Sequence, residues 1–148
     1  MKVKTLLEGK PFMTEYGIVG YSTVVLIACD DEKNILYDCG SKGCALQLKE
    51  ALEKAGMKPE DITHVVISHL HFDHVGNLPL FSNAEILLNK IEWESANQTP
   101  DEWHSIQTLA YLEKRGNLRF VKEGDIISEE VSVMELPGHT PGLIGLRC

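Results

Sequence analysis

The chain has 148 residues, the length of one domain, and its hydrophobic fraction of 43% allows a sizeable core. A formal net charge of −8 argues against general attraction to a nucleic-acid backbone, so we expect no nucleic-acid partner. No stretch is long and apolar enough to span a bilayer, and the first residues lack the apolar segment of a signal peptide, so we expect no membrane partner and a cytoplasmic location.

The first half of the chain predicts strands with one helix among them. Runs rich in Val, Ile and Thr, bounded by turn residues, indicate the strands. In chain order they cover 19–29, 35–38 and 64–68, and the first two form a hairpin through the turn residues 30–34. After this hairpin, apolar residues repeat at helical spacing over 44–55, and Gly56 is placed to end the helix.

The second half predicts another helix among further strands. Thr99 has the chemistry of an N-cap, with Pro100 at the first helical position and Glu102 completing a capping box, so a helix is predicted over 99–115. Strands are predicted over 84–88, 118–121, 126–127 and 131–136, and a last one starts within 142–146. Interleaved strands and helices without a repeat or a linker predict a single layered α/β or α+β domain over residues 1–148.

Residues 69–74 read HLHFDH, which places four metal-competent side chains in six positions directly after a predicted buried strand. Imidazole and carboxylate groups together suit zinc, iron or manganese. His69 and His71 can point the same way while Asp73 and His74 reach a second point, so this segment could supply ligands to two adjacent metal ions. The alternative is a solvent-facing, histidine-rich loop without a metal, which would rarely follow a buried strand by chance.

A second histidine motif lies at residues 138–142, which read GHTPG, after the strand predicted at 131–136. On its own, His139 could be an ordinary residue of a tight turn. Beside the first cluster it becomes the natural third nitrogen ligand. Three protein ligands with an open position are the catalytic form of a zinc site.

The remaining histidines and two of the cysteines are interpreted as structural. His64 starts the predicted buried strand. His104 lies in the predicted 99–115 helix beside Trp103, where it could face a substrate pocket, although a solvated or core position is expected. None of the four cysteines forms a C-x-x-C pair, so no zinc knuckle is indicated. Cys29 and Cys44 are interpreted as small core residues.

These motifs together resemble those of the metallo-β-lactamase superfamily. Residues 69–74 are similar to the family signature H-x-H-x-D-H, residues 38–40 (DCG) to its Asp-x-Gly, and residues 138–142 to its next histidine motif, in the same order along the chain. The resemblance implies an αββα sandwich. It implies a first metal that is bound by His69, His71 and His139. A second metal would be bound by Asp73 and His74, and the carboxylate of Asp38 would hydrogen-bond one of the ligands.

The chain also departs from the family pattern, whose members carry a later bridging aspartate and a final histidine. Neither residue type follows His139. We therefore expect the C-terminal portion of the fold, and part of the second metal position, to be missing from this chain. Such a truncated chain is expected to be poorly soluble or self-associated, for example as a homo-oligomer, and to have little hydrolase activity.

The chemistry of such a site favours hydrolysis. A bound metal lowers the pKa of its water from about 15.7 to about 7, which gives a metal-bound hydroxide at neutral pH, and it polarises the bond under attack. Asp73 is expected to take part in proton transfer as well as to bind the metal. The implied cofactor is one or two zinc ions, with iron or manganese as alternatives at the second position.

The preferred function is a zinc-dependent hydrolase acting on a small-molecule ester, lactone or thioester. The HLHFDH motif followed by Gly76 and Asn77 is similar to that of acyl-homoserine-lactonase-like members. Two alternatives stay open. A phosphodiesterase or nuclease of the same fold would need a basic face near the metal loop, for which the nearest candidates are Lys90, Lys114 and Arg115. A non-catalytic metal-binding protein would keep an incomplete site.

Overall fold

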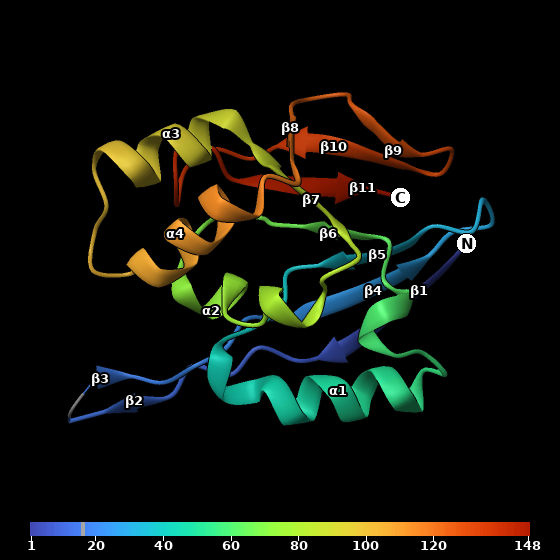
Figure 1. Cartoon of the computed structure of the whole chain (residues 1–148), viewed down its shortest axis with the longest axis horizontal. Helices are drawn as coiled ribbons and strands as arrows, with labels where there is room; N and C mark the ends of the chain where they lie inside the picture. Colours follow the sequence, from blue (N-terminus) through green and yellow to red (C-terminus); the bar gives the residue numbers. More distant parts are fainter. Residues whose placement is uncertain (16) are drawn as a thin grey trace.

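The chain folds into two packed sheets and a layer of helices (Figure 1). The structure is a computed structural model, and it describes residues 1–15 and 17–148. Among these residues the larger sheet has six strands, the smaller has three, and a two-stranded hairpin lies apart from both. Helices cover one face of the six-stranded sheet, and the three-stranded sheet covers the other. These layers are the αββ part of the predicted αββα sandwich.

The six-stranded sheet changes from antiparallel to parallel pairing at its third strand. Its strands lie side by side in the order β1 (Lys2–Leu7), β4 (Val24–Ala28), β5 (Asn34–Tyr37), β6 (His64–Val66), β7 (Glu85–Asn89) and β8 (Leu118–Val121). The first three pair antiparallel, and β5 to β8 pair parallel, with Leu36 opposite Val65 and Val65 opposite Ile86. Parallel strands end at a common edge, where open α/β sheets bind ligands.

The smaller sheet is antiparallel and lies against the larger one. Its strands follow the order β11 (Ile144–Arg147), β10 (Val131–Glu135) and β9 (Ile126–Ser128). Two hydrogen bonds tie β11 to the larger sheet: Ile144 N donates to Ser68 O at 3.1 Å, and Tyr37 OH donates to Ile144 O at 2.8 Å. The separate hairpin consists of β2 (Met13–Thr14) and β3 (Gly17–Ile18).

The helices lie in the connections between strands. The three longer ones are α1 (Ala45–Lys54), α3 (Lys90–Gln98) and α4 (Ile106–Arg115). The short ones are α2 (Phe72–Val75) and the 3-10 helices η1 (Lys42–Cys44), η2 (Pro59–Asp61) and η3 (Leu78–Leu80). None of the described helices combines the length and the apolar character needed to cross a membrane.

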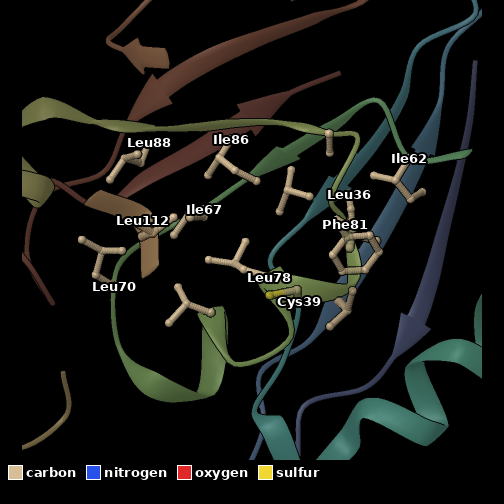
Figure 2. Packing of buried hydrophobic residues seen from close by; sticks show 14 of the residues in the cluster. Leu36, Cys39, Ile62, Ile67, Leu70, Leu78, Phe81, Ile86, Leu88 and Leu112 are labelled. Carbon is tan, nitrogen blue, oxygen red and sulfur yellow. The ribbon is translucent and has the colours of Figure 1, made fainter. Parts of the chain in front are cut away.

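Alternating strand residues build two separate cores. Val65 and Ile67 face the helices and pack with residues such as Leu48 and Leu112, whereas Val66 faces the smaller sheet and packs with Val133. Figure 2 shows the helix-side core, whose labelled residues come from strands, helices and the loops between them. Each fully buried side chain of this kind contributes about 1.5–3 kcal/mol. Cys29 and Cys44 are buried in the structure, which confirms the prediction for both.

The predicted helix over 99–115 is wrong in its first turns. Thr99 is the C-cap of α3, and α4 begins only after Ser105, whose hydroxyl accepts a hydrogen bond from Thr108 N. Its predicted end at Gly116 is confirmed, since this residue takes the left-handed conformation with φ 68°. The capping-box pattern at Thr99 was misleading because the C-cap of α3, Thr99, lies close in sequence to the N-cap of α4, Ser105.

Two other differences concern the N-terminal strands and α3. Of the predicted strand 19–29, only Val24–Ala28 pairs in the sheet, and Tyr21 makes an isolated bridge with Lys10. The outer strand β1 was not predicted, because its lysines and mostly exposed side chains do not give the pattern of a half-buried strand. Helix α3 was also missed. It is weakly amphipathic, and its N-cap is Asn89, whose side chain accepts from Ile91 N at 2.7 Å.

Candidate metal centre

The site residues follow strand ends at one edge of the larger sheet. Asp38 comes directly after β5, and the 69–74 segment follows β6. His69 and His71 lie in the loop before α2, while Asp73 and His74 lie on that short helix. His139 arrives from the other sheet, on the loop between β10 and β11. Strand packing therefore brings together residues up to 101 positions apart in the sequence.

Three histidine rings converge at this edge. One nitrogen from each of His69, His71 and His139 lies within 4.8 Å of the nitrogens of the other two. His139 Nε2 is 3.2 Å from His71 Nδ1, and the His69 ring centroid is 4.6 Å from that of His71 and 4.9 Å from that of His139. His69 and His71 are buried, whereas His139 is exposed. The cluster is thus enclosed by protein at His69 and His71 and open to solvent at His139.

The two buried rings have the properties of metal ligands. Burial, followed by the positive charge of His74 and the neighbouring histidines, lowers the pKa of His69 to about 2. Burial likewise lowers the pKa of His71. Both rings are therefore neutral at pH 7, which is the form that binds metal. His69 Nε2 is buried without a hydrogen-bond partner among the described residues, a condition that costs about 1–3 kcal/mol unless something binds it. These residues fit a divalent metal.

Asp38 organises the base of the site through three hydrogen bonds. Its carboxylate accepts from Ser68 N and Ser68 Oγ at 2.8 Å each, and from His74 Nδ1 at 2.7 Å. Burial alone would lower the pKa of His74, but the hydrogen bond and charge of Asp38, with the charge of Asp73, outweigh it and raise that pKa. Asp38 has φ 58°, in the left-handed region that Asp tolerates better than most residues.

Asp73 and His74 form a second pair beside the three histidines. His74 Nε2 is 3.5 Å from Asp73 Oδ2, and the His74 ring centroid is 4.0 Å from that of His69. All five side chains line one cavity of about 170 Å³, together with Ile18, Phe72 and Trp103. A second cavity of about 350 Å³ extends from His69 and His74 along Asp38 and Tyr37. The structure therefore brings every predicted ligand to one place.

Asp101 and His104 belong to the surroundings of the site, although no sequence motif indicated Asp101 and a solvated or core position was expected for His104. His104 lies before α4, and its Nδ1 is 2.8 Å from Asp101 Oδ1. Asp101 Oδ2 is 3.7 Å from His71 Nε2, a buried nitrogen with no hydrogen-bond partner in the described chain. The D-x-x-H spacing was the available signal, but the incorrect helix assignment hid it. His64 lies apart, on β6, with Nδ1 2.8 Å from Thr63 Oγ1.

Comparisons with known proteins agree with this geometry. The family model described as Metallo-beta-lactamase superfamily matches residues 17–148. N-acyl homoserine lactonase of Bacillus cereus is 38% identical over 92 residues, which cover 62% of this chain and 34% of that protein. Metallo-beta-lactamase domain-containing protein 1 of Xenopus laevis is 33% identical over 112 residues, covering 76% and 42% respectively. In these matches the aligned region spans less than half of each curated relative.

Solved structures share the fold. A protein of Thermotoga maritima described as a metallo-beta-lactamase superposes with a TM-score of 0.84 at 24% identity, covering 98% of this chain and 70% of that one. A variant of AiiA from B. thuringiensis, with N-decanoyl-L-homoserine at its active site, gives a TM-score of 0.71 at 21% identity, covering 87% and 59%. Because the family model matches residues 17–148, which is most of this chain, and the histidine motifs gather at one sheet edge, this chain belongs to the metallo-beta-lactamase superfamily.

Proposed function

We propose that the chain carries the metal centre of a zinc-dependent hydrolase that acts on a small ester, lactone or thioester. The observation that carries the proposal is the convergence of His69, His71 and His139 beside an open cavity. Two of these rings are buried and neutral, and the third closes the set from the exposed side. Three protein ligands with an open position are the arrangement of catalytic rather than structural zinc sites.

The five site residues divide into two ligand groups. His69, His71 and His139 would hold the first metal, and Asp73 with His74 would contribute to a second position, where iron or manganese could replace zinc. When bound, the metal would supply Lewis acidity toward a substrate carbonyl and lower the pKa of water. His74 is oriented to act as a ligand at the second metal position, since its Nδ1–H donates to Asp38 and leaves Nε2 toward Asp73. Asp73 lines the same cavity, so its carboxylate could take up and return a proton there.

The lining of the site favours an uncharged substrate over a phosphodiester. Among the described residues that line the two histidine cavities there is no Lys or Arg. Lys90 pairs with Glu94 at 3.5 Å, and Arg115 donates to the carbonyl oxygens of Phe81 and Ala84. Two of the basic side chains that a nuclease alternative could use are therefore engaged elsewhere. The N-acyl homoserine lactonases among the relatives support a lactone as the first substrate to test.

The test combines metal analysis with a substrate panel. The purified chain is stripped with a chelator, reloaded with zinc, and assayed on an ester, a lactone, a thioester and a phosphodiester. We expect weak turnover of at least one carbonyl substrate, because part of the second metal position is expected to be missing, and this turnover should be lost on chelation and restored by zinc. The double variant His69→Ala/His71→Ala should lose both metal and turnover, while His64→Gln, remote from the cluster, should keep both. Full metal retention in the double variant, or no turnover by the zinc-loaded chain, would overturn the proposal.

A further inference from the structure

We infer that the buried carboxylate of Glu92 is a positioning residue, which fixes the loop of His69 and His71 against the loop of His139. The inference rests on the proposed function only in that these three histidines bind the metal. Glu92 lies in the first turn of α3 and is 1% exposed. A carboxylate buried to this degree is uncommon unless its oxygens are paired.

Each oxygen of Glu92 accepts a hydrogen bond from a different ligand loop. Oε1 accepts from Leu70 N at 2.9 Å, and Leu70 is the residue between His69 and His71. Oε2 accepts from Gly142 N at 3.2 Å, three residues after His139. One side chain therefore joins two segments that are distant in sequence and whose relative placement sets the spacing of the three imidazoles. The backbone bond from Ile144 N to Ser68 O joins the same segments one step farther from the rings.

The packing at Gly142 shows how tightly the second loop is held. A Cβ at this position would come within 2.6 Å of Glu92 Cα and still closer to its amide nitrogen. Only glycine allows the His139 loop to lie so near to the start of α3. Leu70, on the other side of the carboxylate, is buried in the helix-side core and labelled in Figure 2. Both loops are thus anchored to the same turn of one helix.

The charge of Glu92 has a further consequence for the site. In the part of the chain that the structure describes, Glu92 has no ion-pair partner, and its two acceptor bonds come from neutral amides. The N-terminal end of α3 offsets part of the cost of burying the charge. A cation held by the three neighbouring histidines would offset more of it. Glu92 therefore favours both the arrangement of the ligand loops and the presence of a positive ion between them.

Three variants separate this role from general stability. Glu92→Ala removes both acceptor oxygens. Glu92→Gln keeps the shape but can accept from one amide only, because its NH₂ group must then face the other N–H. Glu94→Gln is the matched control, on the same helix with a half-exposed side chain that pairs with Lys90 at the surface. Circular dichroism establishes that each variant is folded, and Co²⁺ affinity and the visible spectrum of the Co²⁺-loaded chain report on the ligand geometry.

We expect Glu92→Ala to bind Co²⁺ about 10- to 100-fold more weakly with an altered visible spectrum, as is usual when partners behind a metal ligand are removed. Glu92→Gln should show a smaller change in the same direction, and Glu94→Gln none. If Glu92→Ala does not fold, Glu92→Gln decides the question.

Folded Glu92 variants with the affinity and spectrum of the unmodified chain would overturn the inference and leave the proposed function intact. An unmodified chain that binds Co²⁺ but hydrolyses nothing would overturn the function and leave the positioning role. A chain that binds no Co²⁺ would overturn both.

Discussion

Asp38 Oδ2 lies 2.7 Å from His74 Nδ1, and this contact determines which nitrogen of the ring faces the cavity. With its proton on Nδ1 donated to the carboxylate, His74 keeps Nε2 toward Asp73 and the neighbouring His69 ring. The same carboxylate accepts from the backbone and the hydroxyl of Ser68, the residue before His69. One buried side chain therefore orients a proposed ligand of the second metal and anchors the segment that carries the first.

Replacing Asp38 by Asn should lower the pKa of His74. The hydrogen bond and charge of Asp38 are the main factors that raise this pKa, and burial, which lowers it, would remain. The amide oxygen of the Asn would accept from Ser68 N, which leaves its NH₂ group toward Nδ1, so the ring should also shift its proton to Nε2. Titration of the metal-free chain by ¹H–¹⁵N NMR measures both effects. The comparison is Asp73→Asn, which removes a smaller contribution and should lower the pKa less. Equal shifts in the two variants would show that Asp38 has no special role.

The metal-free chain should lose stability on acidification below about pH 6.5. The pKa of His69 is lowered to about 2 and that of His71 is lowered as well, so the unfolded state binds protons there that the folded state does not. Each such group reduces the free energy of unfolding by up to about 1.4 kcal/mol per pH unit in this range. His74 has a raised pKa, so its contribution is fully present below pH 6.5 and is lost only as the pH rises through the folded value.

Urea unfolding of the chelator-treated chain at pH 7.0, 6.0 and 5.5 tests this dependence. His69→Gln should flatten the slope between these values, because Gln does not titrate. A free energy of unfolding that stays constant or increases from pH 7.0 to 5.5 in the unmodified chain would contradict the sign derived from the two histidines.

The sequence was sufficient to find the candidate ligands because they lie in two short motifs attached to strand ends. HLHFDH follows a strand with the apolar run of a buried element, so β6 and the position of the motif were both predictable. Glu92 and Asp101 could not be found in the same way. Glu92 belongs to α3, whose weak amphipathicity hid the helix, and its partners are backbone amides that carry no sequence signal. Asp101 and His104 were assigned to a helix that in fact begins later.

Strand β1 shows the other limit of the sequence. It pairs with β4 from Lys2 opposite Ala28 onward, yet most of its side chains are exposed, so the tertiary partner and not the local pattern makes it a strand. The same holds for the order of the parallel strands, which depends on crossovers that local patterns do not specify. What could be predicted was the layered class; the register and the edge where the loops meet required the structure.

Gly76→Ala should destabilise the fold by about 1–3 kcal/mol through overpacking. A Cβ on Gly76 would come within 2.6 Å of the carbonyl carbon of Ser41 and closer still to Lys42 N, and both are backbone atoms that cannot rotate away. Gly76 N also donates to Gly40 O at 2.8 Å, which holds the end of α2 against the loop after β5. The matched control is Gly43→Ala, where the nearest atom is Ser41 Oγ at 3.9 Å. Similar midpoints of urea unfolding for the two variants would show that this close approach is not needed.

Asp101→Ala should weaken binding at the first metal site, because Asp101 favours the tautomer of His71 that a metal requires. His71 Nδ1 faces His139 Nε2 at 3.2 Å, so it must be free of a proton for both nitrogens to share an ion. The ring proton then resides on Nε2, which is buried, has no hydrogen-bond partner among the described residues and lies 3.7 Å from Asp101 Oδ2. A carboxylate at this position stabilises that proton, and His104, 2.8 Å from the other oxygen, holds the carboxylate in place.

Zinc affinity, measured by competition with a chromophoric chelator, should fall about tenfold in Asp101→Ala. It should also fall in Asp101→Asn, because the amide oxygen would stay with Trp103 N, which donates to Oδ1 at 2.9 Å, and an uncharged NH₂ group would then face His71 Nε2. Glu102→Gln changes an exposed neighbour and should leave the affinity unchanged. If Asp101→Ala binds zinc as tightly as Glu102→Gln does, the proton on His71 is set by the metal alone and Asp101 has no part in it.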